Sequence, residues 1–149
     1  MDLKEVLTIS GYPDLFKVVK EARKGVIVES LLTGKRMQAF LNYKVSTLED
    51  IAVFTDSGDV PLKEVFMKMY EKLGGEKAPQ PKDMTEDQIR QLIADVLPDY
   101  DRERVYLSDM RKMIRWYNLL LEKGYLKPEE EESKEEKKED NENNQEAED

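Results

Sequence analysis

Short apolar runs separated by turn residues divide the first 55 positions into predicted strands. Runs rich in Val, Ile, Leu and Phe lie at 15–20, 26–31, 36–41 and 51–55, and such residues favour strands. The clearest unit is a hairpin, in which 26–31 and 36–41 flank Gly34, a residue that adopts the positive φ of a tight turn. Several short strands in this length predict a strongly curved sheet or a small, partly open barrel, because a flat sheet would cover little core.

A helical period replaces this pattern after position 61. Apolar residues recur at intervals of three and four positions over 62–73, 85–97 and 108–124, which is the spacing of one face of an α-helix. Thr85 and Gln88 have the spacing of a capping box at the start of the second segment. Three helices are therefore predicted.

The segment 76–84 carries two prolines and no periodicity, so we predict a surface linker there. The predicted fold class is α+β. It consists of a small β-rich domain with a terminal helix at 1–75, the linker, a helical domain at 85–127 and a tail at 128–149. Because two helices form a thin core, we expect the helical pair to pack on another element or on a partner.

The net charge of -9 resides in the tail. Residues 128–149 hold 12 acids and 3 bases, which leaves the body neutral. With one Ala as its sole apolar residue, the tail cannot bury enough surface to offset the entropy of ordering, so we predict disorder. The tail is either a solvated segment without a binding role or an arm that binds a basic surface or a basic partner.

The chain contains no Cys and no His. This composition excludes disulfides, thiolate or imidazole metal sites, Cys nucleophiles and Ser-His-Asp triads. We therefore predict no catalytic residue, no metal site and no cofactor. The first residues lack the pattern of a signal peptide, no apolar run is long enough to span a membrane, and the mean hydropathy is -0.74. A cytoplasmic location without membrane attachment is expected.

Two short motifs resemble binding loops and fail on inspection. Asp99, Asp101 and Glu103 alternate as in a calcium loop, but Arg104 stands where the tight turn needs Gly and Met110 where a bidentate Glu is required. We expect these carboxylates to turn the chain and to pair with neighbouring arginines. The segment 33–35, Thr-Gly-Lys, leads into a strand instead of a helix N-terminus, so it is interpreted as a hairpin turn and not as a phosphate loop.

Several separate strings of the body resemble an uncharacterised bacterial family, described only as a pair of domains of unknown function. They include Ile9-Ser10-Gly11, Pro13, Gly25 to Leu31, Thr33 to Arg36, Leu97 to Asp101, Arg104 to Tyr106, Ser108-Asp109 and Trp116 to Asn118. The resemblance covers residues 1 to about 126 and excludes the tail. It implies an N-terminal SH3-like β domain followed by a helical C-terminal domain, and it brings no activity or site residue.

Basic and aromatic residues are interleaved in the predicted sheet. Residues 1–44 hold 8 bases against 5 acids, and small curved sheets bind single strands on aromatics over a basic groove. The candidate contacts are Lys17, Lys20 and Arg36, with Tyr12, Phe16, Phe40 and Tyr43 nearby. Because the excess charge is modest and Phe16 and Phe40 are typical core residues, nucleic-acid binding is the weaker alternative.

The helix predicted over 108–124 carries a second apolar stripe. Trp116 and Leu119 lie away from its inward face, and Arg111 and Arg115 occupy the remaining arc. The stripe is either covered by the N-terminal domain or exposed for a partner. We expect the intramolecular cover, because large exposed apolar patches on monomers are uncommon.

These observations favour a non-catalytic, cytoplasmic interaction or adaptor module with a protein partner. Without His or Cys, catalysis would depend on carboxylates, Lys, Ser or Tyr, and no spacing in the chain sets a nucleophile against a base. The alternative is a module that binds RNA or single-stranded nucleic acid through the basic N-terminal sheet.

Overall fold

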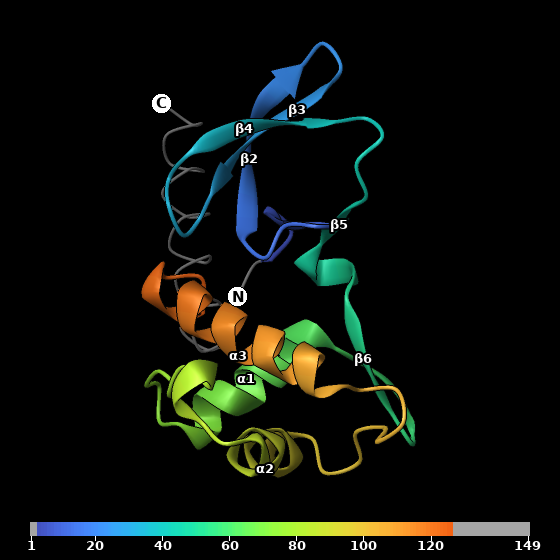
Figure 1. The fold of residues 1–149 in the computed structure, drawn as a ribbon, viewed down its shortest axis with the longest axis vertical. Coiled ribbons are helices and arrows are strands. Elements are labelled where there is room, and N and C mark those ends of the chain that lie inside the picture. The colour runs from blue at the N-terminus through green and yellow to red at the C-terminus, as the bar shows by residue number, and fades with distance from the viewer. Residues whose placement is uncertain (1–2, 127–149) are drawn as a thin grey trace, which may run out of the picture.

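The computed structural model describes residues 3–126 and stacks a curled β-sheet on a layer of helices (Figure 1). The predicted tail, 128–149, lies outside these residues. The fold is α+β, as predicted. Its elements in chain order are β1 (Val6–Ile9), β2 (Leu15–Ala22), β3 (Gly25–Ser30), β4 (Arg36–Phe40), β5 (Val45–Thr47), a 3-10 turn (Leu48–Asp50), β6 (Ala52–Thr55), β7 (Gly58–Pro61), α1 (Leu62–Lys72), a second 3-10 turn (Pro81–Asp83), α2 (Glu86–Val96) and α3 (Leu107–Glu122).

The main sheet is antiparallel with the strand order β4-β3-β2-β1-β5, which requires it to curl. Its outer strands, β4 and β5, are joined only by residues 41–44. In a flat sheet they would lie about 19 Å apart, because neighbouring strands are about 4.8 Å apart. The connection reaches at most about 17 Å when extended, and it bends back where Tyr43 N donates to Phe40 O at 3.0 Å. The sheet is therefore strongly curved, as predicted.

Two glycines are needed in this sheet. Gly34 has φ 77° and its N donates to Ser30 O at 2.9 Å, which closes the predicted hairpin between β3 and β4. Gly25 has φ 156°, and a Cβ at this position would lie 1.9 Å from Ala39 O. A side chain at Gly25 would therefore push β4 away from β3.

The predicted strand 51–55 exists as β6, but its place in the main sheet was predicted wrongly. β6 pairs with β7, which the sequence analysis missed, in a separate two-stranded sheet. The fifth strand of the main sheet is β5, which pairs with β1. The reason is the 3-10 turn, Leu48–Asp50, which redirects the chain, with Thr47 Oγ1 donating to Asp50 Oδ2 at 2.9 Å.

The three predicted helices are confirmed in the described part of the chain. α1 ends before Gly74 and Gly75, both at positive φ. α2 begins with the predicted capping box, in which Gln88 N donates to Thr85 Oγ1 at 3.1 Å and Thr85 N donates to Gln88 Oε1 at 2.9 Å. α3 runs across the middle of the molecule, between the sheet and α2 (Figure 1).

One large core joins the sheet to all three helices, so the predicted helical pair does pack on another element. Leu3, Val6, Leu15 and Leu31 supply the sheet's part of this large core. The helices supply buried residues that include Val65, Phe66, Met69, Ile89, Ile93, Met113, Ile114, Tyr117 and Leu120.

A second, small core lies on the other face of the main sheet. It consists of Leu7, Ile9, Phe16, Val28 and Ala39. Val28 is fully buried although its face points away from the helices. Its cover comes from the curl of the sheet, with Val26, Met37 and Tyr43 packed around it.

The predicted linker, 76–84, is attached to α3 through Glu76, Lys77 and Ala78. The buried Asn118 accepts a hydrogen bond from Ala78 N at 2.8 Å and donates one to Ala78 O at 3.0 Å. Ala78 and Pro81 are buried, whereas most of the segment is exposed. This amide therefore fixes the path of the chain between α1 and α2.

Candidate interaction surfaces

The basic side chains predicted on the sheet form a cross-strand row. Lys17, Glu29 and Arg36 face one another across β2, β3 and β4. Lys17 Nζ lies 3.1 Å from Glu29 Oε2, and Arg36 Nε lies 3.2 Å from Glu29 Oε1. These hydrogen bonds, that of Lys17 first and that of Arg36 second, hold the pKa of Glu29 below its usual range. Glu29 therefore offsets much of the positive charge that the sequence placed here.

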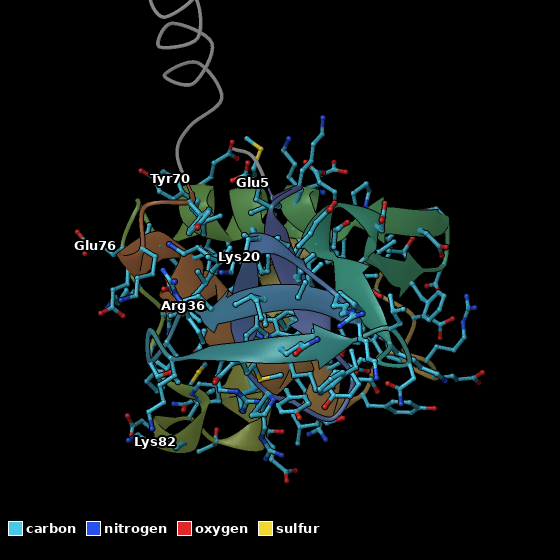
Figure 2. The ribbon with its side chains drawn as sticks, turned by 90° about the horizontal axis from the view of Figure 1, so that it is seen from above. Glu5, Lys20, Arg36, Tyr70, Glu76 and Lys82 are labelled. Atoms are coloured by element: carbon cyan, nitrogen blue, oxygen red, sulfur yellow. The ribbon has the colours of Figure 1, made fainter. Side chains whose placement is uncertain are left out.

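Of the predicted aromatics on the strands, the structure brings only Phe40 onto the face of this row, because Phe40 is four positions from Arg36 on β4. Lys20 is exposed on the face of the row, opposite Ile27, and both it and Arg36 project from strands of the sheet (Figure 2). Phe16 and Tyr43 lie on the other face, where Phe16 is buried in the small core. The predicted interleaving of bases and aromatics is thus split between two faces.

Trp116 and Leu119 lie half-buried at the seam between α3 and the sheet. The indole Nε1 of Trp116 donates to Pro13 O, in the turn between β1 and β2, at 3.4 Å. Both side chains, with the exposed Arg115, line a cavity of about 330 Å³ that also reaches Leu32 in the β3–β4 turn. The expected contact between α3 and the N-terminal sheet is present, and it leaves part of the indole open.

Arg111 is half-buried one turn earlier on α3 and does not line this cavity. Within residues 3–126, no hydrogen bond or ion pair connects the α3 candidates to Lys17, Lys20 or Arg36. The predicted site residues therefore form two separate groups.

The acidic loop matches the prediction in part: Asp101 pairs with an arginine, whereas the Glu103 side chain forms no ion pair among the described residues. Asp101 Oδ2 accepts from Arg104 Nε at 2.8 Å, and Asp101 Oδ1 accepts from the backbone N of Glu103 at 2.9 Å. Arg104 first, and then the Glu103 N–H, lower the pKa of Asp101. Asp99 accepts from Ser57 Oγ at 2.5 Å, and this hydrogen bond lowers the pKa of Asp99. Both carboxylates hold the chain in position.

Among residues 3–126, no group of three or more Asp or Glu side chains is placed to hold a metal ion. In the same residues, no helix combines the length and apolar character required to cross a bilayer.

An aromatic patch borders the small core where the curled sheet stays open. We define it as Tyr12, Phe40, Leu41 and Tyr43. The Tyr43 ring lies 6.2 Å from Tyr12 and 5.6 Å from Phe40, measured between centroids. Tyr12 is 42% exposed, Phe40 41% and Leu41 83%. Three of these four residues are candidate aromatics in the sequence, but the surface itself was not predicted, because Leu41 is the last residue of a predicted strand.

A second cavity, of about 210 Å³, lies between β6 and the N-terminal half of α3. We call it the β6–α3 groove. Ala52 and Phe54 of β6 border one side, and Lys112 and Trp116 of α3 border the other. Sequence analysis missed it, because its two walls are about 60 positions apart in the chain and no local motif marks either one.

Comparison with known proteins gives relatives without an assigned activity. One family model, Domain of unknown function (DUF5606), matches residues 3–48, and another, Domain of unknown function (DUF6852), matches residues 51–120. These matches meet near the 3-10 turn that separates β5 from β6, whereas we predicted the boundary at the linker 76–84. A comparison with curated proteins found no match.

A solved structure supports the same assignment over both parts. It is the solution NMR structure of a protein from Bacteroides vulgatus, determined by the Northeast Structural Genomics Consortium. The two are 38% identical, with a TM-score of 0.68, and the match covers 85% of this chain and 90% of that one. This chain therefore belongs to the family that pairs a DUF5606 domain with a DUF6852 domain, as the resemblance in its sequence implied.

Proposed function

We propose that the protein is a non-catalytic, cytoplasmic interaction module that binds a protein partner. The observation that carries this proposal is the aromatic patch. The patch is an exposed apolar surface beside the small core. Leu41 is 83% exposed, and Tyr12 and Phe40 are each more than two-fifths exposed. Exposed apolar clusters of this kind mark interaction sites more often than isolated exposed residues do.

The patch has the composition of a binding hot spot. Tyr and Phe supply large contact areas with few rotatable bonds, and aromatic residues are enriched at the centre of interfaces. Tyr12, Phe40 and Tyr43 support one another through ring contacts, so the surface is held before a partner arrives. Such preorganisation lowers the entropic cost of binding.

We propose that the protein is not an enzyme because it lacks two side chains that often act as nucleophiles and general bases. The chain has no His or Cys, and the two carboxylates of the 99–101 segment accept hydrogen bonds from Ser57, Arg104 and backbone N–H groups. Carboxylates with a lowered pKa are poor general bases and poor general acids near neutral pH.

We also propose that the main sheet is an SH3-like barrel. The four-strand meander, the return of β5 to β1 and the curl of the sheet support this description. Small barrels of this size fill their interior with side chains and present their rims and loops to ligands. The aromatic patch, at the open side of the curl, has such a position.

The test is affinity capture from native extract with three proteins: wild type, Leu41→Glu and Leu32→Glu. Leu32 is a matched control, 60% exposed but located in the β3–β4 turn beside Trp116. We expect a partner that is retained by wild type and Leu32→Glu and lost with Leu41→Glu. Loss with Leu32→Glu alone would move the site to the Trp116 cavity, and an identical set of proteins on all three would refute the proposal.

The alternative, nucleic-acid binding, stays a prediction and has one specific support. Lys24 and Lys44 lie beside the patch, since Lys24 O accepts from Leu41 N at 2.9 Å and Lys44 directly follows Tyr43. Polyanion binding should weaken steeply as salt rises and strengthen when 128–149 is deleted. Polarisation of a labelled single-stranded oligonucleotide, at low and high salt, separates this alternative from a protein partner.

A further inference from the structure

One edge of β6 is open. Leu62 N donates to Ile51 O at 2.9 Å, so these two residues form a hydrogen-bonded pair of the β6–β7 ladder. Bonded and non-bonded pairs alternate, so the next bonded pair is Val53 and Val60. The N–H and C=O groups of Ala52 and Phe54 therefore point away from β7. Within residues 3–126, the outward groups of Ala52 have no hydrogen-bond partner, and Ala52 is exposed.

The chain already pairs with part of this edge. Asp56 N donates to Asp99 O and Asp101 N donates to Phe54 O, both at 2.9 Å, around the antiparallel bridge between Thr55 and Tyr100. If this pairing continued, residue 103 would lie opposite Ala52. The chain instead turns, with Val105 N donating to Asp101 O at 2.9 Å. The turn leaves the next position of the ladder vacant.

The β6–α3 groove lies directly beside that position. Leu62, Val105 and Met113 give it an apolar lining, and its volume of about 210 Å³ is below that of a typical small-molecule site. A space of this size suits one apolar side chain. A segment added to β6 would direct alternate side chains to one face, so one of them can enter the groove.

The rim of the groove carries two basic side chains, Arg104 and Lys112, and one carboxylate, Asp109. Arg104 is paired with Asp101, and Asp109 accepts from Tyr106 N at 2.9 Å. Lys112, which is exposed, has no ion pair or hydrogen bond among the described residues. An acidic residue two positions from the inserted side chain would lie on the same face of the added strand and would give Lys112 a partner.

We propose that the β6–α3 groove binds an extended peptide of a partner protein, which adds a strand to the open edge of β6, inserts an apolar side chain and places a carboxylate beside Lys112. Main-chain hydrogen bonds supply affinity in this mode, and the side-chain pocket supplies specificity. The chain's own acidic tail fits poorly as the occupant, because Ala147 is its only apolar residue. This site is separate from the aromatic patch, so either proposal can fail alone.

The experiment is an NMR titration of the full chain with a set of acetylated and amidated pentapeptides. Each reads Thr-Φ-Thr-Glu-Thr or Thr-Glu-Thr-Φ-Thr, where Φ is Val, Ile, Leu or Phe, so that Φ and Glu lie on one face of the added strand. We expect saturable shifts of the Ala52 and Phe54 amides and of the Trp116 indole, since Trp116 borders the groove. We also expect the Ala52 amide to become protected from hydrogen exchange, because strand addition gives it an acceptor.

Two variants with a matched control test the geometry. Ala52→Pro removes the outward N–H without breaking the ladder, and the preceding Ile51 already has the extended conformation, φ -92° and ψ 135°, that a following proline prefers. Ala52→Pro should weaken peptide binding by more than about tenfold. N-methylation of the central residues of the peptide should weaken its binding to the wild-type protein to a similar extent. Lys112→Glu should weaken binding by about two- to fivefold, whereas Lys123→Glu at the far end of α3 should not.

Three outcomes would overturn the proposal. The first is the absence of shifts with every peptide at millimolar concentration. The second is that neither change weakens binding: the wild-type protein binds the N-methylated peptide, and Ala52→Pro binds the unmodified peptide, as tightly as wild type binds the unmodified one. Both changes remove strand pairing, and the amide spectrum of Ala52→Pro verifies that this variant is folded. The third is concentration-dependent shifts of the same amides without peptide, which would assign the edge to a second copy of the chain.

Discussion

The two hydrophobic cores of this protein differ in how completely they are covered. The large core has the sheet on one side and three helices on the other, and its central members, such as Phe66 and Tyr117, are fully buried. The small core has only the curled sheet and the 41–44 connection around it. Its border therefore leaves Val18 and Leu41 exposed.

This difference separates stability from recognition. Apolar surface that is fully removed from water contributes about 25 cal/mol per Å², whereas exposed apolar surface contributes nothing until a partner covers it. The large core should hold the fold together, and the border of the small core should be free to bind. The following predictions test this division, from the largest expected effect to the smallest.

Phe66→Ala should destabilise the fold more than Phe16→Ala. Phe66 lies in the large core with no exposure, so loss of its ring should cost about 3–5 kcal/mol in the free energy of unfolding. Phe16 lies in the small core, whose open side can adjust to a smaller residue. Urea unfolding of both variants measures the comparison, and equal losses would contradict it.

Asn118→Ala should cost about 2–4 kcal/mol, although Asn118 is polar. Its side chain satisfies the N–H and C=O of Ala78 at the border of the large core, and each unsatisfied buried backbone group costs about 1–3 kcal/mol. Asn118→Asp would set a buried carboxylate against Ala78 O, so near neutral pH it should cost at least as much as Asn118→Ala. Unfolding by urea is again the measurement, and a cost below about 1 kcal/mol would show that water replaces the amide.

Trp116→Ala should cost about 2 kcal/mol, less than a fully buried ring, since the indole is half-buried between the sheet and α3. Trp116→Phe keeps most of the packing and loses the hydrogen bond to Pro13 O, so its loss should be smaller. As the chain's one Trp, Trp116 should emit at a wavelength between those of buried and exposed indoles. A fully red-shifted emission would show that the seam between sheet and α3 is open in solution.

Tyr117 should titrate above an ordinary tyrosine. Burial raises its pKa to about 12 from an ordinary value of 10.0, and its hydroxyl donates to Glu76 O at 2.8 Å. Because the folded state keeps this proton longer than the unfolded state, its contribution is complete below pH 10 and is lost between about pH 10 and 12. Difference absorbance of tyrosinate should show a late-titrating phenol that is missing in Tyr117→Phe. Titration of all phenols near their ordinary value would place Tyr117 at the surface.

Local signals predicted the helices better than the sheet. Thr85 and Gln88 satisfy each other within one turn, so the start of α2 follows from adjacent residues. Gly34 likewise fixes its hairpin locally. The pairing of β5 with β1 joins positions 36 to 40 apart, and no residue next to β5 in the chain predicts this pairing. Non-local strand pairing is decided by what the whole sheet buries.

The sequence by itself determined the three helices, four of the strands, the α+β class, the family resemblance and the exclusion of Cys and His chemistry, because these depend on spacing and composition. Only the tertiary structure showed that Lys17 and Arg36 form ion pairs with Glu29. It also showed that these two side chains lie on the face of the sheet opposite Phe16 and Tyr43. It also opened one edge of β6 beside α3. A side chain's face depends on strand register, and a groove depends on which distant elements pack together, so neither is encoded within a few neighbouring residues.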